Sequence, residues 1–251
     1  MLEVSFDLEG VEELARELDD MGKRQMPYAT KEAINATAKR IVKAEQGTMK
    51  QVFDRPTRWT LNSMRIEYAK KNRLHGRVSF KDAGKNRPAS SYLSIETEGG
   101  ARGEKGFERR LRAAGYLPPG WYVVPAKGAR LDRYGNITRG MHTKILSDLR
   151  AHADVGVTSN RAAGTPGKYF VPLPKQGVDR FGNITTKKHT LPLGIYKRLK
   201  RGVKAVFIFV QKKPHYKKRL PWGEVAQKTF DRHFEREFDR AFDKAMRTAR
   251  R

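Results

Sequence analysis

The sequence LDRYGNIT occupies residues 131–138 and returns, with two conservative changes, as VDRFGNIT at residues 178–185. Gly adopts positive φ freely, and Asn tolerates it better than most residues do. Asp and Asn side chains also accept hydrogen bonds from nearby backbone groups and so close turns. Each copy, called here a twin turn, therefore predicts a tight turn between two extended arms. Two interpretations stay open: ordinary hairpin turns, or two related loops with a role in binding.

Both twin turns lie in the most basic part of the chain, which has 251 residues and a net charge of +26. Residues 65–220 hold 35 Lys or Arg and 10 Asp or Glu, a net charge of +25, whereas residues 1–64 carry −1 and residues 221–251 carry +2. A field concentrated in this way attracts polyanions, most commonly nucleic acid. A solubilising surface, or a basic face that meets an acidic partner subunit, is the alternative explanation.

The composition excludes several classes of protein. The chain has no cysteine, so neither a disulfide nor a thiolate metal site can form. Its first residues lack the basic start and apolar run of a signal peptide, and we find no apolar stretch long enough to span a bilayer. Hydrophobic residues make up only 38%, which favours a molecule with much surface, extended arm or subunit interface.

The order of predicted elements places the chain in the α+β class. We expect a core domain from residues 1–81 and 202–251, in which a small, mostly antiparallel sheet is packed by long N-terminal and C-terminal helices. A large basic insertion, rich in strands and loops, is expected over residues 82–201. The helices are predicted at 11–21, 26–52, 107–114, 141–152 and after residue 221, and the strands at 1–9, 65–70, 77–81, 89–97, 121–125, 168–172, 191–195 and 203–211.

The first long helix is expected to begin at Met26-Pro27, because Gly22 is a plausible stop for the preceding helix and Pro is tolerated in a first turn. Its apolar face contains one acidic residue, Glu45. A carboxylate in a packed face needs a partner, so we expect one for Glu45.

The final helix carries an apolar residue at every fourth position: Ala226, Phe230, Phe234, Phe238, Phe242 and Met246. Because a helix turns about 100° per residue, this stripe drifts about 40° per step and winds around the helix. One flat partner cannot cover it, so Phe242 and Met246 are predicted as an oligomer interface. On the same helix we expect surface pairs of basic residues with acidic residues three positions later, including Lys228 with Asp231 and Arg232 with Glu235.

No catalytic or cofactor motif is visible. The phosphate loop GxxxxGK[ST] does not occur, and the acidic residues show no pairing typical of a nuclease metal site. The most suggestive metal-ligating group is His142, Asp148, His152 and Asp154, for which an ordinary solvated helix is the better interpretation. We therefore expect no enzyme activity, no metal and no cofactor.

Basic residues close to aromatic residues are the candidates for contact with nucleic acid or a partner. Lys and Arg neutralise phosphates without reading sequence, and no sequence-reading motif is visible, so the contact is expected to be nonspecific. The candidate residues are Arg130, Arg133, Arg139, Arg180, Lys187, Lys188, Lys197, Arg198, Lys200 and Arg201, near Tyr134, Phe181 and Tyr196.

Three motifs occur in a familiar order: FDRPT at 53–57 with TLN at 60–62, then LDRYGN at 131–136, then KPHYKKRLP at 213–221 before an aromatic-rich helix. In this order the chain resembles the minor tail protein Z family of tailed phages and prophages, which are tail-completion proteins. The ordered set spans most of the chain. The second twin turn and the size of the basic insertion have no place in the family pattern.

The resemblance implies a structural role in the virion, at the head-proximal end of the tail, for a protein made in the host cytoplasm. It implies a ring of identical subunits that contacts other tail or neck proteins and lies near genomic DNA, with no membrane and no catalysis. Two alternatives remain: a standalone nonspecific nucleic-acid-binding protein, or a nuclease or processing enzyme.

Overall fold

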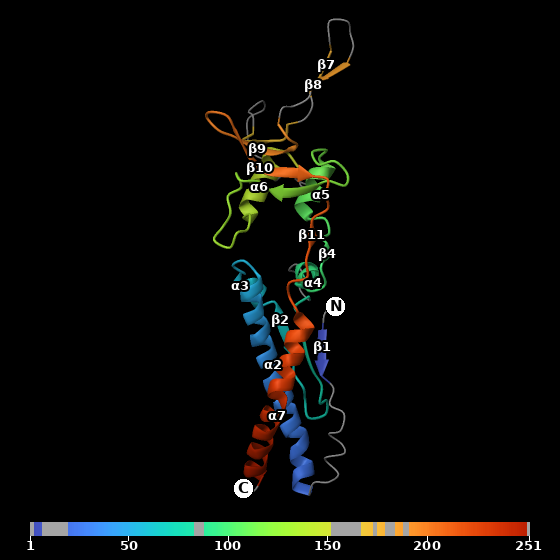
Figure 1. The fold of residues 1–251 in the computed structure, drawn as a ribbon, viewed down its shortest axis with the longest axis vertical. Coiled ribbons are helices and arrows are strands. Elements are labelled where there is room, and N and C mark those ends of the chain that lie inside the picture. Colours follow the sequence, from blue (N-terminus) through green and yellow to red (C-terminus); the bar gives the residue numbers. More distant parts are fainter. Residues whose placement is uncertain are drawn as a thin grey trace. The chain divides into compact units, whose positions relative to one another are not determined.

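The computed structural model describes residues 3–6, 20–82, 88–151, 167–172, 175–178, 184–187 and 191–249. The chain divides into two compact units: unit 1 comprises Met1–Gly100 and Tyr216–Arg251, and unit 2 comprises Ala101–His215. The class is α+β, with long N-terminal and C-terminal helices and small antiparallel sheets (Figure 1). None of the described helices is long and apolar enough to cross a membrane.

Unit 1 is built on two long helices, α2 (Asp20–Val52) and α7 (Trp222–Ala249), which pack side by side (Figure 1). Small buried residues, among them Ala38 on α2 and Ala226 and Ala245 on α7, allow a close approach of the two helices. Arg40 on α2 donates two hydrogen bonds, of 2.9 and 2.5 Å, to the nearly buried carboxylate of Glu237 on α7. Burial and this ion pair together fix the register of the two helices.

The predicted start of the first long helix was wrong, because α2 continues through both Gly22 and Pro27. Pro27 lies inside α2, where it removes one backbone donor, and the buried side chains of Met26 and Ala29 stabilise the helix against that loss. Of the helix predicted over residues 11–21, residues 11–19 lie outside the described residues. The expected partner of Glu45 is also missing: both carboxyl oxygens are buried without a hydrogen bond within the described part of the chain.

A three-stranded antiparallel sheet completes the unit, in the order β1 (Glu3–Phe6), β3 (Gly76–Phe80), β2 (Met64–Glu67). The predicted strand pair around residues 71–76 is thereby confirmed. In the sequence, α3 (Arg58–Leu61) links α2 to β2, and its N-terminus is capped by the Thr57 hydroxyl, 3.1 Å from the Thr60 amide.

The strand predicted over residues 89–97 was wrong, because this segment is the helix α4 (Ser90–Glu98). Buried residues recur at Ala89, Leu93, Glu96 and Thr97, which is the spacing of one helical face. The Asp82 carboxylate accepts a hydrogen bond of 2.8 Å from the Ser90 amide and so satisfies the helix N-terminus from a distance in sequence. Unit 1 therefore extends to residue 100 and not to residue 81.

Unit 2 contains a four-stranded antiparallel sheet in the order β5 (Tyr122–Pro125), β10 (Val203–Val210), β9 (Gly194–Arg198), β6 (Tyr169–Phe170). The helices α5 (Gly106–Ala113) and α6 (Arg139–Asp148) belong to the same unit. The buried core includes Leu111, Leu117, Val123, Ile145, Leu146, Ile195, Val206, Phe207 and Phe209.

The central strand β10 was expected in the core domain with the long helices, and the structure places it in unit 2. Its backbone pairs with β5 on one side and β9 on the other, and Val206, Phe207 and Phe209 are buried there. Two short pairs complete the sheets: β4 (Gly100–Ala101) with β11 (His215–Tyr216), and β7 (Lys175–Val178) with β8 (Ile184–Lys187).

Candidate polyanion-binding surface

Unit 2 holds most of the excess charge of the chain. Its 115 residues contain 24 Lys or Arg and 6 Asp or Glu, a net charge of +18, which leaves +8 for unit 1. Four of the six acidic residues belong to the described part of unit 2. Glu104 forms an ion pair with Arg112, and Glu108, Asp132 and Asp148 accept hydrogen bonds from backbone amides.

Glu108 is fully buried and serves as an internal anchor. It accepts hydrogen bonds from the Arg102 guanidinium (2.8 and 2.5 Å) and from the backbone amides of Lys105 and Val123 (2.8 Å each). Burial by itself raises the pKa of Glu108, but the hydrogen bonds from Arg102 and the two amides outweigh it and hold the pKa below its ordinary value. Glu108 thus links α5 to β5. Its negative charge neutralises the buried Arg102 and does not reduce the positive charge at the surface.

Asp132 closes the first twin turn. Its Oδ1 accepts hydrogen bonds from the amides of Tyr134 (2.8 Å) and Asn136 (2.9 Å), and its own amide donates to the Asn136 carbonyl at 2.8 Å. Gly135 has φ of 77°, the left-handed conformation that the glycine was expected to supply. The predicted turn is therefore confirmed for this copy, and Thr138 directly after it caps α6.

Arg133 lies along its own turn. It donates a hydrogen bond of 2.8 Å to the Tyr134 hydroxyl, and its guanidinium carbon is 4.8 Å from the centroid of that ring. The side chain stays exposed, so its charge still faces solvent. The aromatic residue of the turn thus positions an arginine, and one face of its ring is covered by that arginine.

The second twin turn shares its closing pair with the first. Val178 pairs with Ile184 between β7 and β8, and Leu131 pairs with Ile137, the same two positions 47 residues earlier. Arg180 and Phe181, at the turn itself, and Lys188 lie outside the described residues, whereas Lys187 ends β8. The two copies therefore agree in register wherever both are described.

A hollow of about 940 Å³ lies beside the first twin turn, between α6, β6, β9 and the segment after β5. Four cations from different parts of unit 2 line it: Arg130, Lys144, Lys168 and Lys197. In the part of the chain that the structure describes, none of the four forms an ion pair.

Two carboxylates also line this hollow, and both are engaged in hydrogen bonds. Asp132 accepts the turn amides described above, and Asp148 accepts a hydrogen bond of 2.9 Å from the Tyr169 amide. The lining residues have a net charge of +2, and the four cations form no ion pair with the described residues. Such an arrangement suits the spaced negative charges of a polyanion.

The hairpin between β9 and β10 forms a second basic feature. Its turn is closed by a 3.1 Å hydrogen bond from the Leu199 amide to the Gly202 carbonyl, with Gly202 at φ of 83°. Lys200 and Arg201 are exposed at the tip, and the apolar side chains of Leu199 and Val203 beside them are 46% and 43% exposed. Cations and apolar side chains are therefore presented together.

Arg198 at the base of this hairpin is held in place. Its Nε donates to the Gly167 carbonyl at 3.1 Å, and its guanidinium lies 4.2 Å from the centroid of the Phe170 ring. Arg139, another predicted contact residue, is exposed at the first position of α6. Arg130 and Lys197 are the two predicted residues that the structure brings to one hollow.

Sequence reasoning missed Lys144 and Lys168, which complete that hollow. No motif marks them, since one lies on α6 and the other precedes β6, and only the folded sheet brings them near Arg130 and Lys197. Phe242 and Met246, predicted as an oligomer interface, are half-buried on α7, where the rings of Phe238 and Phe242 stack 6.0 Å apart. That assignment stays a prediction.

The suspected metal-ligating group is not assembled among the described residues. His142 lies against Phe107 and Phe207, with ring centroids 4.6 and 6.0 Å away, and burial together with the nearby Lys105 lowers the pKa of its imidazole. His152 and Asp154 lie outside the described residues. In the described ranges, no group of three or more His, Cys, Asp or Glu is placed to hold a metal ion.

A scan against protein-family models, a search of curated proteins and a search of solved structures each gave no match for this chain.

Proposed function

We propose that this chain is a structural protein of a tailed-phage virion, located at the head-proximal end of the tail or in the neck. Copies of it form a ring, and the basic surface of unit 2 contacts DNA or the acidic face of an adjacent ring. The hollow lined by Arg130, Lys144, Lys168 and Lys197 is the observation that supports the contact. The proposal assigns no catalytic role to the chain.

The motifs that carry the resemblance to the minor tail protein Z family occupy structural joints. Residues 53–57 link α2 to α3, with Arg55 at φ of 49° and paired with Asp54 at 2.8 Å. Residues 131–136 form the first twin turn, and residues 213–221 lead through β11 to the buried Leu220 at the start of α7.

Contact with DNA through unit 2 is expected to be electrostatic and independent of sequence. Exposed lysines and arginines displace counterions from phosphates, so affinity falls with salt with a slope of about −0.9 per phosphate contacted. The exposed Leu199 and Val203 at the hairpin tip add apolar contact area between the cations.

Charge reversal in the hollow tests the DNA contact. We expect the double variant Arg130→Glu with Lys144→Glu to bind duplex DNA at least about tenfold more weakly than the natural chain, with a shallower salt slope. Both side chains are exposed, so the thermal unfolding midpoint should be preserved. The measurement is fluorescence anisotropy over a salt series.

The matched control reverses two exposed arginines of α7, Arg240→Glu with Arg247→Glu, which changes the net charge equally but lies in unit 1. Equal loss of affinity in the control and the test variant would mean that total charge, and not this hollow, governs binding. Unchanged affinity in the test variant would contradict DNA contact through the hollow.

A standalone nonspecific nucleic-acid-binding protein is the second candidate. It is favoured by one observation: the hollow and the hairpin tip are built from a single chain and need no second copy to be complete. Particle fractionation separates the two proposals. A tail component co-purifies with virions at a fixed low copy number, whereas a DNA-coating protein stays with free nucleic acid.

A further inference from the structure

Helix α7 is built on a repeat of four residues. The sequences FDRH, FERE, FDRA and FDKA occupy residues 230–233, 234–237, 238–241 and 242–245, so a phenylalanine, a carboxylate and a cation recur in that order. Because an α-helix turns about 100° per residue, each carboxylate lies about 100° around the helix from its phenylalanine, and each cation about 200°. A partner that contacts the phenylalanines therefore meets the carboxylates, whereas the cations lie on the other side of the helix.

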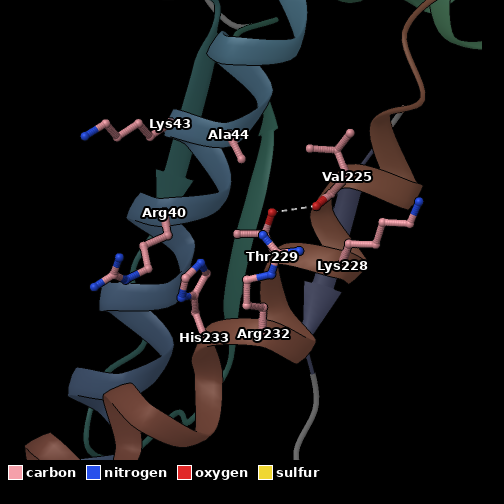
Figure 2. Close-up of a pocket in the computed structure, with 8 residues that line it drawn as sticks. All are labelled: Arg40, Lys43, Ala44, Val225, Lys228, Thr229, Arg232 and His233. Carbon is pink, nitrogen blue, oxygen red and sulfur yellow. Dashed lines mark hydrogen bonds between the residues drawn. The ribbon is translucent and has the colours of Figure 1, made fainter.

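The groove between α2 and α7 agrees with this arrangement. It contains a hollow of about 420 Å³, and the described residues of α7 that line it include the cations Lys228 and Arg232 but no phenylalanine and no carboxylate (Figure 2). The last position of the repeat faces α2, where Glu237 pairs with Arg40 and Ala245 is buried. The cations thus flank α2 on one side of α7, and the phenylalanines lie on a different side.

The phenylalanines form a continuous row that is open along most of its length. Neighbouring ring centroids are 4.8 Å apart from Phe230 to Phe234, 6.3 Å apart from Phe234 to Phe238, and 6.0 Å apart from Phe238 to Phe242. Phe230 packs against the buried core of unit 1. The other three are half-buried and are not among the described side chains that pack against this core.

The carboxylates beside this row have no internal counter-charge in the part of the chain that the structure describes. Glu235, Asp239 and Asp243 are exposed and form no ion pair with the described residues. Successive carboxylates are about 6 Å apart along the helix axis. These three carboxylates, together with the rings of residues 234, 238 and 242, are called here the phenylalanine face.

The charge of the phenylalanine face restricts what can cover it. A second phenylalanine face would bring like charges together, which disfavours a symmetric pair of α7 helices. Residues 7–19, which lie outside the described residues, hold six acidic residues and one basic residue and therefore carry the wrong sign. The occupant that fits must present cations next to apolar side chains.

The tip of the β9–β10 hairpin combines these two features. Lys200 and Arg201 are the two central residues of its turn, and both are exposed without an ion pair among the described residues. Leu199 and Val203 flank the turn and are 46% and 43% exposed. Val203 lies opposite Arg198, so Leu199 belongs to the other face of the hairpin. Either face of the tip therefore offers one aliphatic side chain beside the two cations.

We propose that the phenylalanine face of α7 binds the tip of the β9–β10 hairpin from a second copy of the chain. Lys200 and Arg201 meet the carboxylates of α7, and an aliphatic side chain of the tip packs on the rings, so charge and apolar surface are complementary at one contact. This inference rests on the proposed ring and names the surfaces that form it. Because each copy carries both a face and a tip, the contact is heterologous, and such contacts run head to tail and close into a ring.

Charge reversals in the full chain test this contact by sedimentation velocity at low salt. We expect the natural chain to assemble, and we expect Asp239→Lys with Asp243→Lys, or separately Lys200→Glu with Arg201→Glu, to weaken assembly about tenfold or more. An equal mixture of the two double variants should recover assembly, because each contact between them again joins opposite charges. All four side chains are exposed, so the thermal unfolding midpoints should be preserved.

The control Arg240→Glu with Lys244→Glu reverses two exposed cations on the other side of α7 and should assemble like the natural chain. Assembly that survives both double variants, or that the mixture does not restore, would overturn the inference and leave the proposed ring to other surfaces. Duplex DNA is the competing occupant of the tip. Loss of DNA affinity in Lys200→Glu with Arg201→Glu, with assembly intact, would assign the tip to DNA instead. A natural chain that stays monomeric would contradict the proposed ring as well.

Discussion

At the scale of single residues, the buried Glu45 makes unit 1 sensitive to pH. Its side chain is fully buried on α2, its oxygens have no hydrogen bond among the described residues, and burial raises its pKa from 4.5 to about 8. In the folded protein it is therefore neutral at pH 7, whereas in the unfolded chain it is ionised. Between pH 4.5 and about 8 the unfolded state gains a charge that the folded state lacks, so the free energy of unfolding falls as pH rises.

Glu45→Gln should remove this pH dependence. At pH 7 we expect the variant to raise the free energy of unfolding by on the order of 3 kcal/mol, because an amide has no charged form to favour unfolding. Denaturant midpoints measured from about pH 5 to 9 provide the check. Glu32→Gln, a half-buried position on the same helix, is the control. A pH slope as steep in Glu45→Gln as in the natural chain would show that other groups cause it.

Glu108 is the opposite case, a buried carboxylate that is fully partnered. Glu108→Gln leaves the Arg102 guanidinium buried without its counter-charge, and we expect unit 2 to lose about 3 kcal/mol of stability. Because the pKa of Glu108 is lowered, its stabilisation should fade as pH falls below the unfolded-state value of 4.5. Tryptophan fluorescence of Trp121 during denaturation would report the loss, and an unchanged midpoint would refute the anchoring role.

At the scale of elements, different residues of the twin turns determine the shape of the turn and carry its positive charge. Asp132 and Gly135 define the shape of the first copy, whereas the exposed Arg133 is not needed to close it. The matched residue of the second copy is Arg180. If the turns bind a polyanion, the arginines Arg133 and Arg180 make the contact. Residues such as Asp132 and Gly135 only hold the turn in the shape that positions the arginine.

Charge reversal at both arginines, Arg133→Glu with Arg180→Glu, should weaken binding to duplex DNA or to a partner while the unfolding midpoint stays within a few degrees. Asp132→Ala should instead lower stability by about 1 kcal/mol or more, because two backbone amides lose their acceptor. Binding assays and thermal melts of the two variants provide the comparison. Collapse of stability in the double arginine variant would mean that these are ordinary structural turns.

Elements whose determinants are local in sequence were predictable. The first twin turn closes through hydrogen bonds that span at most four residues. The strand β10 is a continuous run rich in apolar residues, which predicts a buried strand. The helix α4 was not predictable in this way, because its N-terminus is satisfied by Asp82 and its Tyr92 stacks 5.2 Å from Trp59. Trp59 is distant in sequence from Tyr92, and such tertiary contacts override a strand-like pattern.

The candidate sites were predictable only in part, for the same reason. The charge count located the basic segment, but the hollow of unit 2 needs Lys144 and Lys168 from elements that only the fold brings together. On α7 the spacing predicted pairs of Lys228 with Asp231 and of Arg232 with Glu235, which are not formed among the described residues, whereas Glu237 pairs with Arg40 of α2. Spacing along one helix cannot show which charges meet those of a neighbouring helix.

At the scale of the whole molecule, the chain consists of two compact units, one dominated by long helices and one built on a four-stranded sheet. Unit 1 packs two long helices, of which α7 carries a partly exposed row of stacked rings from Phe230 to Phe242. Unit 2 carries +18 of the net charge of +26. The proposed role requires copies of the chain to associate and unit 2 to bind a polyanion, and we expect the row of rings and the charge of unit 2 to serve these two contacts.

Imaging of purified virions with this chain labelled tests that role most directly. We predict a ring of copies at the head-proximal end of the tail, with the basic surface of unit 2 facing the DNA path or the adjoining ring. Absence of the chain from purified particles, or its location anywhere other than the head–tail junction, would contradict the account.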